Sequence, residues 1–173
     1  MIYELDSAIL DYMKDKVYRM RIKGIALDKD TELPIVLLQS EDLKQVLPLP
    51  IGPFEASAII IEIEGVRPPR PLTHDLLSQF FKKHNFNIKR LEIYEAIDDN
   101  FLARIYYGKG FRNYKMEVRP SDGIAIAIRE EAPIYVFQNV LEISNDHRWY
   151  VSEDKEAVPE IIFLNSVSET PIM

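Results

Sequence analysis

The sequence predicts an α+β protein, with a mixed, mostly antiparallel sheet and helices packed against it. Residues 18–23 and 113–118 alternate between apolar and polar side chains, as half-buried strands do. Between them lie segments that begin with proline or a capping side chain and continue with apolar residues at helical spacing. The chain has 173 residues, 47% of them hydrophobic, which suits one globular domain and rules out global disorder.

The first third of the chain predicts a helical arm followed by strands. Residues 1–16 carry apolar side chains at helical spacing and are expected to form a short helix or arm. Strands are expected at residues 18–23, 33–39 and 45–51. The third contains Pro48 and Pro50, which suit an edge strand or the end of a strand, because proline cannot donate a ladder hydrogen bond.

Residues 58–64 fit either a helix or a strand. Their β-branched side chains and late alternation favour a strand. Pro53 and Glu55 suit the first turn of a helix, and Gly65 suits its end. We predict a helix that begins near Pro53 and is buried on most of its surface.

A stiff, doubly basic loop at residues 66–71 precedes the second helix, because its three prolines exclude a helix and a central strand. Thr73 is expected to cap that helix and Asn85 to end it. Its buried face is expected to consist of Leu76, Leu77, Phe80 and Phe81.

The rest of the domain predicts a sheet rich in hairpins and one more helix. Residues 120–123 open a helix that continues to residue 131, with Ser121 as an expected cap. Further strands are expected at residues 87–97, 101–107, 113–119 and 133–137. The chain is therefore divided into an arm at 1–16, one domain at 17–141 and an acidic C-terminal extension at 142–173.

Composition excludes several classes of protein. The chain has no cysteine, so it holds no disulfide scaffold, zinc–thiolate site, iron–sulfur cluster or cysteine nucleophile. No apolar run reaches the roughly 18 residues that cross a bilayer, and the N-terminus lacks a signal peptide, so we expect a cytoplasmic protein without membrane contact. The net charge of −7 disfavours generic nucleic-acid binding, although residues 67–119 carry 11 basic and 6 acidic side chains.

Two polar clusters stand at expected helix starts, where free N–H groups favour anions such as phosphate. The first consists of Arg67, Arg70, Thr73, His74 and Asp75, and the second of Arg119, Ser121 and Asp122. His74 could transfer a proton near neutral pH. Asp122, Asp75 and Glu55 could hold a divalent cation such as Mg²⁺ or Mn²⁺. Together these are the components of a metal-assisted phosphodiester hydrolase.

The same residues also suit ordinary structural roles. Thr73 and Ser121 are common helix caps, and Asp75 is a common first-turn acid. Arg119 would pair with Asp122 three residues later. Spacing alone leaves both interpretations open, and signatures such as a P-loop or a zinc-protease motif are absent from the sequence.

Four short motifs follow one another within residues 17–141. They are residues 49–56 (LPIGPFEA), 69–77 (PRPLTHDLL), 119–125 (RPSDGIA) and 132–136 (APIYV). In their residues, order and spacing these motifs resemble those of the bifunctional nuclease family. The chain departs from the family pattern at Pro50, where an aromatic is usual, and at Gly123, where alanine is usual.

The resemblance implies that family's α+β fold, a homodimer, and combined DNase and RNase activity. A crowded hairpin also predicts a homodimer, because its aromatic surface exceeds what a small sheet readily covers. The side chains concerned are Phe101, Ile105, Tyr106, Tyr107, Phe111 and Tyr114.

Two functions remain open. The first is a nuclease that hydrolyses phosphodiester bonds of DNA and RNA with low sequence specificity, assisted by a divalent cation. The second is a non-catalytic dimeric module that binds a nucleotide, an anionic metabolite or a partner protein. For the nuclease, the expected catalytic residues are His74, Asp75, Asp122 and Arg119; the substrate-binding residues are Arg67, Arg70, Thr73 and Ser121; and the metal ligands are Asp122, Asp75 and Glu55.

If these residues form one site, residues 70–75 and 119–122 should meet in space. An arginine from each segment should then face a common cleft, with His74 on its wall.

Overall fold

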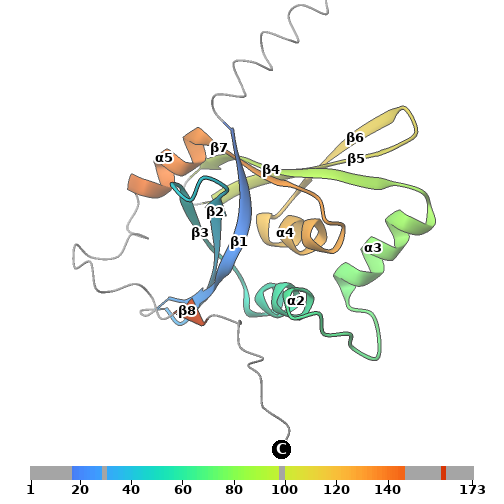
Figure 1. The fold of residues 1–173 in the computed structure, drawn as a ribbon, viewed down its shortest axis with the longest axis horizontal. Coiled ribbons are helices and arrows are strands. Elements are labelled where there is room, and N and C mark those ends of the chain that lie inside the picture. Colours follow the sequence, from blue (N-terminus) through green and yellow to red (C-terminus); the bar gives the residue numbers. More distant parts are fainter. Residues whose placement is uncertain (1–16, 29–30, 98–99, 147–160, 163–173) are drawn as a thin grey trace, which may run out of the picture.

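A sheet of eight strands forms the centre of the computed structural model, which describes residues 17–28, 31–97, 100–146 and 161–162 (Figure 1). The strands are β1 (Val17–Leu27), β2 (Pro34–Ser40), β3 (Val46–Pro50), β4 (Asn87–Ile97), β5 (Asn100–Lys109), β6 (Arg112–Val118), β7 (Ile134–Phe137) and β8 (Ile161–Ile162). Their order is β3-β2-β1-β7-β4-β5-β6, and β8 pairs with β1. Among these described strands, the β4–β7 pair is the one that runs parallel. The predicted fold class, a mixed and mostly antiparallel sheet with packed helices, is confirmed.

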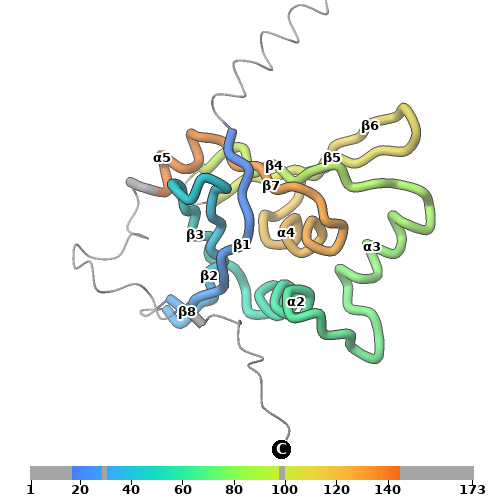
Figure 2. The backbone as a smooth tube through the Cα atoms, in the orientation of Figure 1, coloured from blue at the N-terminus to red at the C-terminus, as the bar shows by residue number. Residues whose placement is uncertain are grey.

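Four helices accompany the sheet in the described part of the chain. They are α2 (Pro53–Ile63), α3 (Thr73–Lys83), α4 (Pro120–Arg129) and α5 (Gln138–Asp146). Helix α4 packs on β4 and β5, and both α2 and α3 pack on α4. Figure 2 shows that the β1–β3 and β4–β6 parts of the sheet run in different directions, with α2 and α4 in the angle between them. Helix α5 lies apart, on the other side of β1 in this view (Figure 1).

The core fills the space between the sheet and these helices. Fully buried side chains include Leu38, Leu49, Ile59, Leu91, Ile105 and Ile124. Burial of one such side chain stabilises the fold by about 1.5–3 kcal/mol. The first turns of α2, α3 and α4, which carry the candidate residues, are therefore fixed by a shared core.

Residues 58–64 form most of α2, which confirms the helix prediction over the strand alternative. Pro53 occupies the start of the helix, where its missing N–H costs nothing. Gly65 follows the C-cap with φ +64°, the left-handed conformation that commonly ends a helix.

The expected caps at Thr73 and Ser121 are wrong. The N-cap of α3 is Leu72, whose backbone N–H donates to Oδ2 of Asp75 at 2.8 Å. The N-cap of α4 is Arg119, followed by Pro120 at the first helical position. Thr73 and Ser121 thus lie inside the first turns of the helices, one and two residues after the N-cap residues.

The buried face of α3 also differs from the prediction. Phe81 is buried and Leu77 is half-buried, as expected, but Leu76 is 62% exposed and Phe80 is 53% exposed. Ser78 is buried instead. The helix lies at the outside of the packed helices, so its narrow contact with α4 covers fewer apolar side chains than its sequence offers.

Gly123 allows α4 to lie directly on the sheet. A Cβ atom at this position would meet Cδ1 of Leu91 at 2.5 Å, and Leu91 is fully buried. This glycine therefore permits a close approach between helix α4 and strand β4 of the sheet.

The described residues cover only part of the expected arm, domain and C-terminal extension. Residues 1–16, predicted as a helical arm, lie outside the described residues. Helix α5 runs across the expected boundary at residue 141, and β8 adds residues 161–162 beside β1. No helix in the described part of the chain is long and apolar enough to cross a membrane.

Candidate active site

The two segments expected to converge do meet, at the N-terminal ends of α3 and α4. Nε2 of His74 lies 3.1 Å from Oδ1 of Asp122. His74 is in the first turn of α3 and Asp122 in the first turn of α4, so the packing of these helices brings the side chains together. An ionised carboxylate only accepts hydrogen bonds, so the imidazole donates from Nε2, and Nδ1 is the acceptor nitrogen of the neutral ring.

Arg119 joins the same carboxylate to α2. Its Nε donates to Oδ2 of Asp122 at 2.7 Å, and its Nη2 donates to Oδ1 at 3.2 Å. The same Nη2 lies 3.0 Å from Oε1 of Glu55 in the first turn of α2. Arg119 therefore bridges two helix starts, although its own side chain is 68% exposed.

The environment keeps Asp122 ionised. Its partial burial acts to raise the pKa, but hydrogen bonds from Arg119 and His74 outweigh it and hold the pKa of Asp122 below the ordinary value of 3.8. The same pairing with Asp122, reinforced by Glu55, raises the pKa of Arg119. Both groups are therefore charged over the physiological pH range.

Two cavities open on either side of the Arg119–Glu55 ion pair, and these two side chains line both of them. The first, of about 420 Å³, also contains Phe54, Ser57, Ala58, Ile61, Leu72, Thr73, His74 and Asp122 in its wall. The second, of about 470 Å³, also contains Leu33, Leu49, Pro50, Ile51, Gly52, Asn100, Phe101, Pro120 and Ser121. The predicted residues Thr73 and Ser121 thus line different cavities that share one ion pair.

Asp75 faces a different partner. Its Oδ1 accepts a hydrogen bond from Nε of Arg129 at 2.6 Å, and its Oδ2 accepts one from the backbone N–H of Leu72. Burial acts against ionisation, but the bonds from Arg129 and Leu72 outweigh it and hold the pKa of Asp75 below 3.8. Asp75 thus fixes the first turn of α3, next to His74.

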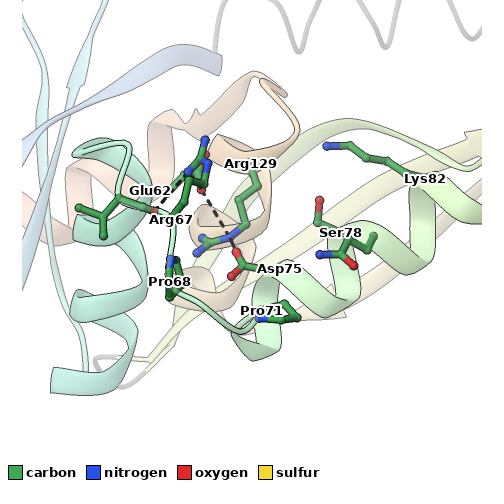
Figure 3. A pocket seen from close by; sticks show the side chains of 10 residues that line it. Glu62, Arg67, Pro68, Pro71, Asp75, Ser78, Lys82 and Arg129 are labelled. Carbon is green, nitrogen blue, oxygen red and sulfur yellow. Dashed lines mark hydrogen bonds and ion pairs between the residues drawn. The ribbon is translucent and has the colours of Figure 1, made fainter.

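A third cavity, of about 340 Å³, lies beside this pair, and Figure 3 shows Asp75 and Arg129 joined in its wall. Arg67 also lines it and lies 3.3 Å from Glu62. Arg70, the second arginine of the loop, is exposed and lines none of the three cavities. The expectation that an arginine from each segment faces one cleft therefore holds for Arg119 but not for Arg70.

Arg129 is a residue that sequence reasoning missed. Its side chain is 3% exposed, and it also donates to the backbone oxygens of Ala125, at 2.8 Å, and Ala58, at 3.1 Å. It thus ties α2, α3 and α4 together behind the site. In sequence it is a basic residue in the last turn of an apolar helix, a position where such residues usually face solvent and offset the helix dipole.

The three carboxylates expected to hold a metal ion are not gathered in one place. Glu55 and Asp122 share Arg119, whereas Asp75 pairs with Arg129. Among the residues that the structure describes, no three histidine or acidic side chains are placed to hold one metal ion. Glu55 and Asp122, the two acids beside His74, are the ones that share a cavity wall.

Comparison with known proteins identifies the family. The model of the bifunctional nuclease domain matches residues 35–147. An uncharacterized protein of Mycobacterium tuberculosis is 38% identical over 122 residues, which cover 70% of this chain and 73% of the relative. Bifunctional nuclease 1 of Oryza sativa subsp. japonica is 26% identical over 110 residues, 61% of this chain and 33% of the relative.

Bifunctional nuclease 2 of the same rice is 25% identical over 123 residues, 68% of this chain and 38% of the relative. The match therefore covers about a third of the length of the first plant protein and 38% of the second. The matched region contains α2, α3 and α4, and with them every residue of the His74–Asp122–Arg119–Glu55 network. The chain belongs to the bifunctional nuclease domain family.

Proposed function

We propose that this protein is a nuclease that hydrolyses phosphodiester bonds of DNA and RNA with low sequence specificity. The observation that carries the proposal is the hydrogen bond between His74 and Asp122 in the wall of a cavity that Arg119 also lines. An imidazole oriented by a carboxylate, beside a guanidinium, provides proton transfer and phosphate binding in one place. Relatives named bifunctional nuclease support the choice of substrate.

In this proposal the side chains around the cavity divide proton transfer and phosphate binding between them. His74 takes a proton from the attacking water or gives one to the leaving oxygen. Asp122 fixes the imidazole and stabilises its protonated form. Arg119 exchanges one of its carboxylate contacts for a phosphate oxygen and stabilises the charge that develops in the transition state. Thr73 and Ser121, which line the two cavities, offer hydroxyls to the substrate.

A divalent cation is part of the proposal. Mg²⁺ is commonly held by one or two carboxylates together with water and substrate phosphate, so a set of three acids is not required. Glu55 and Asp122, which line one cavity together with His74, are the two that would hold it, and Asp75 has no part in this set because it lines a different cavity beside Arg129. When bound, the cation would supply charge to the phosphate.

The alternative function is a non-catalytic module that binds a nucleotide, an anionic metabolite or a partner protein. One observation favours it: both carboxylates beside His74 are already paired with Arg119, which is the arrangement of a structural lock between helices. In that case the family resemblance would reflect shared architecture alone.

We also propose that the protein forms a homodimer. The hairpin on which this expectation rested hides part of its apolar surface, since Ile105 is fully buried and Tyr107 half-buried, whereas Phe111 and Tyr114 are exposed. Leu76 and Phe80 on α3 offer further exposed apolar area. Light scattering should give a mass near twice the 20.1 kDa of one chain, and a mass of one chain at micromolar concentration would reject the dimer.

The nuclease proposal is tested by incubating the purified protein with labelled single- and double-stranded DNA and RNA, with and without Mg²⁺ or Mn²⁺. The matched control is the His74→Ala protein, purified in the same way. Cleavage by the parent, lost in the variant, supports the proposal, because a contaminating nuclease would act equally in both preparations. Equal cleavage, or none, favours the non-catalytic module.

A further inference from the structure

One end of the sheet combines uncompensated positive charge with exposed aromatic rings. Residues 76–91 and 100–116 contain no aspartate or glutamate, in a chain whose net charge is −7. Strand pairing brings the two segments together, because Gly108 of β5 lies between Asn87 of β4 and Asn113 of β6. We call this end the hairpin tip. It consists of Lys89, Lys109, Phe111, Arg112, Tyr114 and Lys115.

The four cations of the hairpin tip are exposed and have no acidic partner. Within the ranges that the structure describes, none of them forms an ion pair with a carboxylate, and Lys89 donates to the side-chain oxygen of Asn113. The arginines of the candidate site differ, since Arg119 and Arg129 each pair with acidic side chains. Charge that is free to attract an anionic polymer therefore lies at the tip.

Of the two aromatic rings of the tip, that of Tyr114 is supported by neighbouring rings. Phe111 is fully exposed at the turn, and Tyr114 is 38% exposed. The ring of Tyr114 stacks on Tyr107, with centroids 5.3 Å apart and planes 23° apart, and meets the edge of Phe86 at 5.9 Å. A ring supported in this way loses little conformational freedom when a ligand stacks on it.

The backbone of the tip is also tightly built. Gly110, with φ +58°, and Phe111 form the turn between β5 and β6, where a tight hairpin favours glycine. At Gly108 a Cβ atom would lie 2.7 Å from the carbonyl oxygen of Arg112, so the two strands approach more closely than a side chain would allow. Figure 1 shows the free end of this hairpin on the same side of the molecule as α3 and the start of β4.

We propose that the hairpin tip binds a single strand of nucleic acid, at a distance from the His74–Asp122 site. Lysines and an arginine contact the phosphates, and Phe111 and Tyr114 stack on bases, which only a single strand exposes. The inference rests on the proposed function for the class of its partner, but it requires no catalysis at the tip. A second copy of this chain is a poor occupant, because a symmetric contact would oppose four cations with four cations.

The tip and the candidate site lie toward opposite ends of α3. His74 is in the first turn of this helix, and Lys83 ends it, shortly before Phe86 and β4. Eleven residues at 1.5 Å each give a helix of about 16 Å. A strand bound at the tip must therefore extend along this length to reach His74, so only substrates longer than a few nucleotides use both places.

The test compares two triple variants of the full-length protein, each of which removes three positive charges. One carries Lys109→Gln, Arg112→Gln and Lys115→Gln at the tip. The matched control carries Arg21→Gln, Lys23→Gln and Lys44→Gln, which are exposed elsewhere, and whose parent side chains form no ion pair in the described structure. A Phe111→Ala variant tests stacking. Binding of a labelled oligothymidylate of about 20 nucleotides is measured by fluorescence anisotropy in EDTA, across a range of salt concentrations.

The tip triple is expected to bind at least about tenfold more weakly than the parent, and its salt slope should fall by about 2, because three phosphate contacts are lost. Phe111→Ala should lose about tenfold in affinity with an unchanged salt slope. The control should stay within about twofold of the parent. Equal losses in the tip triple and the control, or no loss in Phe111→Ala, would overturn the proposal.

Two further measurements separate this proposal from the nuclease function. If the protein cleaves DNA or RNA, the tip triple should raise KM for long strands but leave hydrolysis of bis(p-nitrophenyl) phosphate unchanged, because that small diester cannot reach the tip. Loss of activity on the small diester would overturn the proposal and leave the nuclease standing. Binding at the tip without any cleavage would reject the nuclease and keep the tip. A halved mass of the tip triple in light scattering would identify the tip as a dimer surface instead and overturn the proposal.

Discussion

His74 and Asp122 are 48 positions apart in the chain, and their side chains lie 3.1 Å apart, between Nε2 and Oδ1. The contact depends on α3 and α4, whose first turns present the two side chains to each other. Arg119 and Glu55 extend it to the first turn of α2. The network therefore joins three helix starts, and its chemistry can be tested one side chain at a time.

Replacing Arg119 by lysine keeps the positive charge but removes the planar fork that now contacts both oxygens of Asp122 and one of Glu55. Because a lysine cannot bind phosphate in the same bidentate way, we expect KM for oligonucleotides to rise about tenfold or more. Urea unfolding should change little, since the Arg119 side chain is largely exposed. An unchanged KM would remove Arg119 from substrate binding.

Replacing Arg129 by methionine should act on stability. The side chain is almost fully buried, and its loss leaves Asp75 without its ion-pair partner and removes a hydrogen bond to the oxygen of Ala58. Breaking a buried pair in this way costs about 3 kcal/mol, which urea unfolding would detect as a lower midpoint. Adding Asp75→Asn should restore part of the loss, because the unpaired charge is then gone. Equal stability of Arg129→Met and the parent would contradict the claim that Arg129 holds α2, α3 and α4 together.

The depressed pKa values of Asp75 and Asp122 predict how stability depends on pH. A carboxyl group whose pKa is lower in the folded than in the unfolded protein favours folding above its unfolded value, here 3.8. That contribution is lost as the pH falls from about this value through the lower folded pKa. The melting temperature of the parent should therefore fall more steeply below pH 4 than that of the Asp75→Asn, Asp122→Asn double variant. Parallel curves for the two proteins would show that these carboxylates do not stabilise the fold.

Much of the fold was predictable because it depends on local pattern. Alternation located the strands, and Pro53 together with Gly65 identified the helix at residues 58–64 despite its β-branched side chains. The exposure of Leu76 and Phe80 was not predictable, because their spacing matches a buried face and only the packing of α3 at the outside leaves them uncovered. Local pattern determines which elements form, but it does not determine how much of each face a neighbour covers.

The candidate site was predictable in its members but not in their pairing. Motif positions correctly suggested that His74 and Asp122 would meet. They also suggested that Asp75 would join Asp122, whereas Asp75 turns toward Arg129, a residue 54 positions away with no motif around it. A buried arginine that satisfies distant carbonyl groups has no signature in a single sequence, because its partners are chosen by tertiary packing.

The most direct test of the account is a double-mutant cycle on kcat/KM with His74→Ala, Asp122→Asn and the double variant, using a labelled single-stranded oligonucleotide. If the two residues act as one proton-transferring unit, each single change should lower kcat/KM by about 10²–10⁴-fold. The kcat/KM of the double variant should then be no lower than that of the less active single variant. Circular dichroism should show the same fold in all four proteins. Single losses that multiply in the double variant, or variants as active as the parent, would contradict the claim that His74 and Asp122 act together.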